Sequence, residues 1–161
     1  MDLRGAVALV TGGNGGLGQR ICHALAKEGV HVAVMYAQSS DQAESVAREL
    51  TSRHQINAAA LACDVTDSAA VERVVGEVTR HFGRLDILVN DAAYNKAIPF
   101  ADLDGLTMGV WDKIMAVNLT GPMRLIKAVA PVMKGQGRGR IVNISSVAGV
   151  GPTGSSIAYA V

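Results

Sequence analysis

The sequence predicts an α/β fold, a parallel sheet with helices on both faces. Short apolar runs that suit buried strands alternate, from residue 6 to residue 145, with segments whose apolar residues recur at helical spacing. The composition is 49% hydrophobic but only 4% aromatic, which is typical of one compact domain rich in small aliphatic residues. Alternation of strands and helices implies parallel pairing with right-handed crossovers.

The first strand and the first helix are joined by a stretch that is almost entirely glycine. Residues 6–10 form an unbroken apolar run, as expected of a strand covered on both faces. Residues 11–18 are Thr-Gly-Gly-Asn-Gly-Gly-Leu-Gly, and the helix that follows stops near Gly29. Its apolar face consists of Leu17, Ile21, Ala24 and Leu25. Glycine permits positive φ and has no Cβ, so this backbone can approach the diphosphate of a dinucleotide at the positive end of the helix.

The glycine-rich turn has two other interpretations. A nucleoside triphosphate loop needs a lysine directly after its last glycine, but Gln19 follows Gly18 in this chain. A turn that binds no ligand would contain the same residues, so the motif alone leaves this alternative open.

The second strand and helix follow the same scheme. Residues 30–35 form an apolar strand, and the helix over residues 41–53 carries Ala43, Val46, Ala47 and Leu50 on one face. Ser39 and Ser40 precede this helix and are candidates for its N-terminal cap.

Three more strands complete the predicted sheet. Residues 57–63 form an alanine-rich third strand, and the helix over residues 67–82 carries a stripe of valines that suits core packing. Residues 85–90 form the fourth strand, and a long helix spans about residues 111–133. Residues 140–145 form the fifth strand, which becomes an edge with unpaired backbone groups if the sheet stops there.

Polar residues end several of the apolar strands, namely Thr11, Tyr36, Asp64, Asn90, and Ser145 with Ser146. Ligands of such sheets bind at the carboxyl ends of the strands, so these side chains are expected to converge there. Each also has a structural alternative: Asp64 can cap a helix, Asn90 can tie adjacent loops, and Ser146 can stabilise a turn.

In order and spacing, these residues resemble the motifs of the short-chain dehydrogenase/reductase family. The motifs are Thr11-Gly12-x-x-x-Gly16-x-Gly18, Asp64-Val65, Asn90-Asp91-Ala92-Ala93, Asn118, Ile141-Val142-Asn143-Ile144-Ser145-Ser146 and Tyr159. The resemblance runs from about Gly5 to Val161 and is greatest to the ketoacyl carrier protein reductases. It implies a Rossmann-type doubly wound sheet, a nicotinamide cofactor and interconversion of a small-molecule carbonyl and alcohol. It also implies that residues 1–161 are a single dinucleotide-binding domain, incomplete at the C-terminus and truncated after the fifth strand.

The resemblance assigns the cofactor-binding residues. Gly12, Gly16 and Gly18 would form the diphosphate cradle, with backbone contacts from Asn14 and Leu17. The adenine would be bordered by Asp64 and Val65, and the adjoining ribose region by the motif that contains Asn90 and Ala92. A subunit interface on the helix over residues 111–133 would make the protein a homo-oligomer, whereas a deeply buried helix is the alternative.

The resemblance also assigns the catalytic residues. A serine and a tyrosine thirteen positions apart select Ser146 and Tyr159. Tyr159 would be the general acid or base, and Ser146 would hold the carbonyl oxygen, because hydride addition leaves negative charge there. A free tyrosine has a pKa of about 10 and needs a nearby cation at neutral pH. The family places a lysine four residues later, at position 163, beyond Val161. A truncated, non-catalytic dinucleotide-binding or assembly module is therefore the alternative function.

Asn118 precedes Pro122 by four residues in the same predicted helix. Proline has no N–H and pushes against the carbonyl four residues before it. The Asn118 carbonyl would then be free to hold a water, which resembles the family's proton relay. A tolerated kink beside Gly121 is an equal alternative.

The residues after the second strand bear on the choice of cofactor. An acid there binds the ribose hydroxyls of NAD and repels a 2'-phosphate, but residues 36–39 are Tyr-Ala-Gln-Ser. Tyr36 and its neighbours therefore favour NADP, with NAD as the alternative. A lysine or arginine at position 37 or 15 would support NADP further, but these positions hold Ala37 and Gly15. Asp91 and Ala93 depart from the family's asparagine and glycine, which affects the expected affinity for the cofactor.

Composition argues against several other classes of protein. The formal net charge is +1 with no basic stripe, which does not indicate a nucleic-acid partner. No signal peptide or membrane-spanning run is present, so a cytoplasmic protein is expected. Cys22 and Cys63 lie in apolar segments and are expected to be small buried side chains. The four histidines share no ligand spacing, and no metal site is predicted.

Overall fold

The computed structural model describes residues 2–151 and 155–161. Its strands form one parallel sheet in the order β3-β2-β1-β4-β5. They are β1 (Val7–Thr11), β2 (His31–Tyr36), β3 (Ala58–Ala62), β4 (Ile87–Asn90) and β5 (Arg140–Asn143). The predicted fold class is confirmed, and β1 lies at the centre of the sheet.

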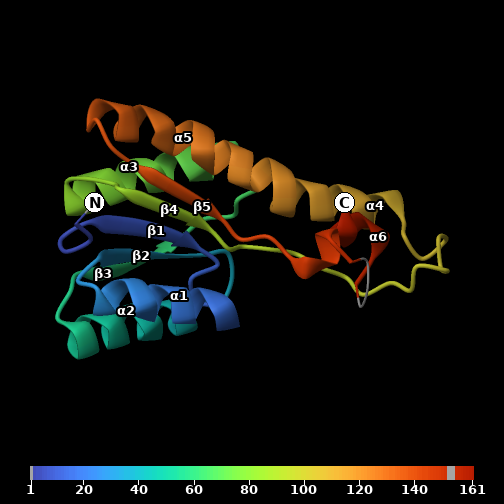
Figure 1. Ribbon diagram of the computed structural model, residues 1–161, viewed down its shortest axis with the longest axis horizontal. Coiled ribbons are helices and arrows are strands. Elements are labelled where there is room, and N and C mark those ends of the chain that lie inside the picture. Colours follow the sequence, from blue (N-terminus) through green and yellow to red (C-terminus); the bar gives the residue numbers. More distant parts are fainter. Residues whose placement is uncertain (1, 152–154) are drawn as a thin grey trace.

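Helices cover both faces of this sheet (Figure 1). On one face lie α1 (Gly16–Lys27) and α2 (Ser40–His54), and on the other lie α3 (Ser68–Phe82) and α5 (Gly121–Gly135). The strands point toward the end of the molecule that holds α4 (Met108–Met115) and α6 (Ile157–Ala160). Among the residues described, no helix combines the length and apolar character needed to cross a bilayer.

The sheet divides the core into two apolar layers. Every residue of β1 is buried, as its unbroken apolar run predicts. Successive side chains alternate between the layers, so Val7 and Leu9 pack with α3 and α5, whereas Ala8 and Val10 pack with α1 and α2. Cys22 and Cys63 are free, buried thiols within these layers, which confirms their prediction as small core residues.

The helix predicted over residues 111–133 is interrupted. A π-helical segment, η1 (Ala116–Thr120), separates α4 from α5, and the Gly121 N–H donates to the Ala116 carbonyl five residues before it. Apolar spacing continues through both α-helices and therefore could not reveal the extra residue in this turn. Pro122 lies in the first turn of α5, where its missing N–H is tolerated.

The predicted side-chain cap of α2 is wrong for Ser39. This residue precedes the helix with a φ of 62°, in the left-handed region, and its hydroxyl makes no capping hydrogen bond. Asp67 does cap its helix, because its carboxylate accepts the N–H groups of Ala69 and Ala70. Spacing alone identified the start of α2 but not the backbone conformation of the residue before it.

β5 is an edge strand, as expected if the sheet ends with it. All its residues are exposed, including Ile141 and Val142, whose exposed fractions are 39% and 45%. An apolar edge with free backbone donors and acceptors is a surface on which another strand can pair.

Asp86 joins three strands at their amino ends. Its carboxylate is fully buried and accepts the Val7 N–H at 3.0 Å. Arg84 donates two hydrogen bonds to it, at 2.6 and 2.7 Å, and Arg138, just before β5, donates a third at 3.3 Å. These donors offset the cost of burying a charge, so Asp86 fixes the starts of β1, β4 and β5 relative to one another.

Asp86→Ala is expected to lower the free energy of unfolding by about 2–4 kcal/mol, because one N–H and two guanidinium groups lose their acceptor. Urea denaturation followed by circular dichroism measures this change. Glu44→Ala is the matched control, because it removes an exposed carboxylate that pairs with Arg48 at 3.5 Å. The control should change stability by less than about 0.5 kcal/mol. Equal effects of the two substitutions would contradict the role given to Asp86.

Candidate active site

The register of the parallel sheet aligns the carboxyl ends of its strands. Thr11 of β1 pairs with Met35 of β2 and with Asn90 of β4, and Asn90 pairs with Asn143 of β5. The Asn90 side-chain amide donates to the Asn143 side-chain oxygen at 2.8 Å. The predicted convergence of the strand ends is therefore present. Asn90 also joins the ends of β4 and β5, which agrees with the structural role given above as the alternative for this residue.

Glycines at the junction of β1 and α1, among them Gly12 and Gly18, leave little room for a side chain. Gly12 has a φ of 64°, and a Cβ on it would lie 3.0 Å from the Ala92 Cα. A Cβ on Gly18 would collide with the Gly12 carbonyl oxygen, whereas one on Gly16 would meet nothing within 4 Å. Packing within the protein thus requires glycine at positions 12 and 18 and leaves open space beside Gly16.

The amino end of α1 has the features of an anion site. Gly15 precedes the helix and provides no side-chain cap, and the first turn contains no acidic residue. The first N–H groups of a helix have no partner within it, and the helix dipole makes this end positive. Together with the space beside Gly16, these donors fit the diphosphate of a dinucleotide.

Thr11 holds the segment after β4 against this turn. Its hydroxyl oxygen accepts the N–H groups of both Asp91 and Ala92, each at 2.9 Å. The close approach of Ala92 to Gly12 follows from these two bonds. The two segments therefore form one wall of the site.

A cavity of about 680 Å³ extends from the glycine turn along the carboxyl edge of the sheet. The predicted cofactor-binding residues that line it are Gly12, Asn14, Leu17, Asp64, Val65 and Ala92. Ser146 and Tyr159 line the same cavity. Tyr36, Gly16 and Gly18 are not among the described residues of its wall, and after β2 the wall is formed by residues 37–39.

Asn14 fixes the part of this wall that follows β2. Its side-chain amide donates to the Gln38 carbonyl at 2.9 Å, and its own carbonyl accepts the Gln19 side-chain amide at 2.7 Å. The glycine turn is thereby linked to the segment in which Ser39 adopts its left-handed conformation.

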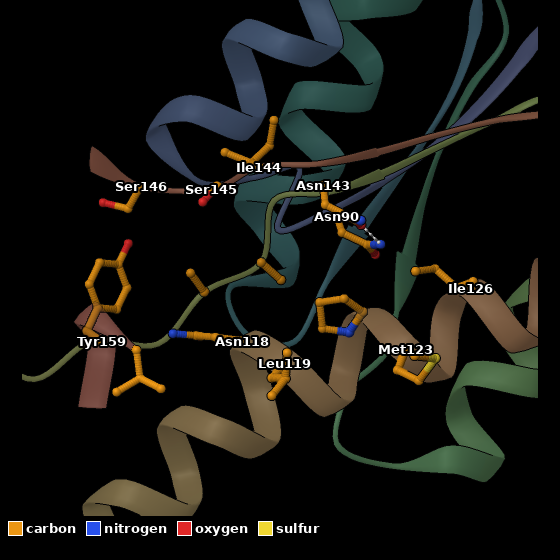
Figure 2. Close-up of a pocket in the computed structure, with 14 residues that line it drawn as sticks. Asn90, Asn118, Leu119, Met123, Ile126, Asn143, Ile144, Ser145, Ser146 and Tyr159 are labelled. Atoms are coloured by element: carbon orange, nitrogen blue, oxygen red, sulfur yellow. Dashed lines mark hydrogen bonds between the residues drawn. The ribbon is translucent and has the colours of Figure 1, made fainter. Parts of the chain in front are cut away.

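A second cavity, of about 370 Å³, adjoins the first and shares Ser146 and Tyr159 with it (Figure 2). Asn90 and Asn118 line this second cavity, so all three predicted catalytic residues meet there. Figure 2 shows the Tyr159 hydroxyl directed toward the segment that carries Ser145 and Ser146. The Ser146 hydroxyl also accepts the Ala148 N–H at 3.2 Å and so caps the short helix η2 (Val147–Gly149).

Asn118 lies in the π-helical segment and holds the loop that follows β4. Its side-chain oxygen accepts the Tyr94 N–H at 2.8 Å, and its amide donates to the Tyr94 carbonyl at 2.9 Å. At the end of the same segment, a Cβ on Gly121 would lie 2.8 Å from the Val65 side chain. The interrupted helix therefore packs against two segments that contribute to the cavity wall.

Burial shifts the pKa of three groups near the glycine turn. It raises the pKa of the Cys22 thiol to about 12, with a further contribution from the Asp91 charge. Burial also raises the pKa of the Cys63 thiol to about 11, and the Asp64 charge makes the next largest contribution to this increase. It also raises the pKa of the Asp91 carboxyl above its ordinary value of 3.8. Both thiols are therefore protonated at neutral pH and are poor nucleophiles.

Lys113 and Tyr94 were not predicted as residues of the site, but both line the larger cavity. The Lys113 ammonium lies 4.2 Å from the centre of the Tyr94 ring, a cation–π contact. Lys113 occurs within an amphipathic helix, where a lysine ordinarily indicates a solvated face. No local pattern identified it, because only the path of the loop after β4 brings Tyr94 beneath it.

Sequence comparison identifies the family. The model of the short chain dehydrogenase family matches residues 6–161, so the chain belongs to this family. The predicted resemblance is thereby confirmed, together with the nucleotide-binding Rossmann fold of these oxidoreductases.

Two relatives are named as ketoacyl reductases. A protein of Streptomyces violaceoruber, named as ketoacyl reductase 2 of granaticin polyketide synthase, is 42% identical over 96% of this chain and 60% of its own length. The 3-oxoacyl-[acyl-carrier-protein] reductase FabG of Staphylococcus aureus is 38% identical over 88% of this chain and 56% of its own length. This chain thus spans about 60% of the length of the relatives that it matches.

Two similar solved structures differ in the cofactor that their descriptions name. An NAD+-bound xylitol dehydrogenase has a TM-score of 0.91 and 32% identity, covering 99% of this chain and 60% of its own. An NADPH-dependent 3-quinuclidinone reductase from Rhodotorula rubra has a TM-score of 0.90 and 27% identity, covering 99% and 59%. Both cofactors thus occur among similar structures.

Gly18→Ala is expected to destabilise the protein by about 1–3 kcal/mol, because the added methyl group collides with the Gly12 carbonyl. Gly16→Ala adds the same methyl group where a Cβ meets nothing within 4 Å. The control should change the free energy of unfolding by less than about 1 kcal/mol. Thermal unfolding without nucleotide measures both, and equal destabilisation would contradict the described turn.

Proposed function

We propose that this chain is the nucleotide-binding and catalytic part of an NADP-dependent oxidoreductase that interconverts a carbonyl and an alcohol by hydride transfer. One observation carries this proposal: the glycine turn lines the same cavity of about 680 Å³ as Ser146 and Tyr159. A dinucleotide bound by its diphosphate at the turn would share this cavity with two hydroxyl groups. The names of the ketoacyl reductases support a carbonyl substrate.

The two hydroxyl groups provide the acid–base chemistry of the proposed reaction. A bound nicotinamide dinucleotide supplies the capacity to donate or accept hydride. Tyr159 donates a proton to the carbonyl oxygen as negative charge develops, and it accepts a proton in the reverse direction. Ser146 donates a hydrogen bond to the same oxygen. Asn118 positions the loop at Tyr94 and, through its backbone carbonyl, holds a water of the proton relay.

The catalytic assignment predicts different effects on turnover and on binding. In the complete gene product, Tyr159→Phe should lower kcat by at least about 100-fold, because the acid–base group is lost. NADPH affinity should change less than about threefold, since the ring is retained. Stopped-flow reduction of a 3-ketoacyl thioester and fluorescence titration measure the two effects.

Ser146→Ala should also lower kcat, by about 10–100-fold, through loss of a hydrogen bond to the developing charge. Ser155→Ala is the matched control, because its hydroxyl donates to the Asn95 side chain at 3.0 Å and neither residue lines a cavity described above. Full activity of Tyr159→Phe or of Ser146→Ala would contradict the assigned roles.

The proposed preference for NADP rests on the uncharged wall after β2. Ala37, Gln38 and Ser39 line the cavity and provide no carboxylate to repel a 2'-phosphate. Ala37→Asp is therefore expected to weaken NADPH binding by at least about tenfold relative to NADH, with Ala37→Asn as the uncharged control. Fluorescence titrations of the wild type and both variants with NADPH and with NADH measure the six affinities. An unchanged NADPH-to-NADH ratio would show that residue 37 does not face the ribose.

We further propose that residues 1–161 form a single dinucleotide-binding domain, incomplete at the C-terminus, of a longer homo-oligomeric protein. The relatives are longer, and β5 exposes apolar side chains at the sheet edge. Leu119 and Met123 are 68% and 56% exposed on the helix where the subunit interface is proposed. A codon for lysine at position 163 would support this extension, since a cation near a phenol favours its ionised form.

A non-catalytic dinucleotide-binding module is the second candidate function. Lys113 is the only lysine or arginine among the described residues that line the two cavities, and it contacts Tyr94. A protein of this kind would bind NADPH but would reduce no carbonyl compound. A stop codon directly after Val161 together with nucleotide binding would favour this candidate.

A further inference from the structure

Asp91 is an acidic residue in the wall of the cavity that extends from the glycine turn. The residue follows β4, and the Thr11 hydroxyl holds its N–H at 2.9 Å. The next residue, Ala92, lies so close to Gly12 that a Cβ there would be 3.0 Å from the Ala92 Cα. Asp91 lines the cavity of about 680 Å³ together with Gly12 and Gly15.

No partner in the described part of the chain neutralises this carboxylate. Its backbone N–H makes a hydrogen bond, but no donor or cation among residues 2–151 and 155–161 is paired with its oxygens. Asp86 is a useful contrast, since an N–H and two arginines surround that carboxylate. Asp91 is half-buried and therefore carries a charge that is neither paired nor fully hydrated.

Asp91 lies beside the glycine turn, because the Thr11 hydroxyl holds its N–H and it lines the cavity with Gly12 and Gly15. Its charge helps to raise the pKa of Cys22, whose thiol approaches the Gly13 carbonyl at 3.8 Å. The titratable groups that line the cavity with Asp91 are Cys63 and Asp64 after β3, Tyr94 after β4, Lys113 on α4 and Tyr159 on α6. Lys113 is the one basic side chain in this set, and it lies over the Tyr94 ring rather than in an ion pair with Asp91.

We propose that the Asp91 carboxylate opposes the diphosphate of a bound dinucleotide, so that dinucleotide affinity depends on the protonation state of this side chain. The inference rests on the proposed function, because it requires a diphosphate at the amino end of α1. Two like charges in a partly dehydrated cavity repel each other more strongly than they would in water. Protonation of Asp91 removes the repulsion, and binding therefore takes up a proton.

The direction of the pH dependence follows from linkage. Burial already raises the pKa of Asp91 in the free protein, and a nearby diphosphate raises it further. Affinity is therefore greatest at low pH, where Asp91 is protonated in both states. It falls as pH rises from the pKa of the free protein to that of the complex, and it is constant above both.

The test compares the affinity of NADPH for the wild type and for Asp91→Asn across about pH 5 to 8. The asparagine has nearly the same shape and retains the N–H that Thr11 accepts. We expect Asp91→Asn to bind NADPH about tenfold more tightly at pH 8, with the difference decreasing toward pH 5. The 2'-phosphate of NADPH itself titrates near pH 6, but this effect cancels in the ratio of the two affinities. Fluorescence titration or calorimetry gives this ratio without any turnover.

Two further variants separate a local charge effect from other causes. Asp91→Ala should reproduce the tighter binding, because loss of charge rather than gain of an amide is responsible. Asp112→Asn removes the same charge from an exposed position on α4 that lines neither cavity, and it should leave affinity unchanged. Circular dichroism of each variant confirms that it is folded.

The outcomes distinguish this inference from the proposed function. Wild-type binding that is unaffected or weakened by Asp91→Asn at every pH would overturn the inference, since Asp91 would then be neutral in effect or an acceptor for the ligand. The proposed function would survive that result. Failure of all folded variants to bind NADPH or NADH at any pH would overturn the proposed function and this inference with it.

Discussion

The contact between the β1–α1 turn and the segment after β4 is the constraint on which the site depends. One hydroxyl, that of Thr11, accepts two successive N–H groups and draws Ala92 against Gly12. These segments are distant in sequence and meet only because β1 and β4 are adjacent parallel strands. The absence of a Cβ on Gly12 permits the contact, and the Thr11 hydroxyl holds the two segments together. The cavity wall is therefore a consequence of sheet order as much as of the glycine motif.

Sequence reasoning predicted the features that have a period or a required order. Unbroken apolar runs gave the buried strands, and their alternation with helices gave parallel pairing. The order of the glycine, Asp64, Asn90, Ser146 and Tyr159 motifs identified the family that residues 6–161 match. Each of these signals is repeated many times or distributed along the chain. A single irregular residue does not obscure them.

Features that depend on one backbone turn were missed. The π-helical segment at Ala116–Thr120 changes neither composition nor apolar spacing, yet it shapes the helix that carries Asn118. Ser39 has the residue type of a cap but adopts φ of 62°, so its hydroxyl makes no capping hydrogen bond. Lys113 reaches the cavity because the loop after β4 passes beneath it. These features are set by tertiary contacts that a local pattern does not contain.

The charge of the cavity wall determines how an anionic ligand can be held there. Its described residues include two carboxylates, Asp64 and Asp91, and one cation, Lys113. Asp64 is partly satisfied, because one of its oxygens accepts both the N–H and the hydroxyl of Thr66 at 2.8 Å. Side-chain charge therefore contributes little attraction, and the attraction for a diphosphate must come from the N–H groups and dipole of α1. Backbone donors of this kind require close contact, and the open space beside Gly16 permits that contact at the start of α1.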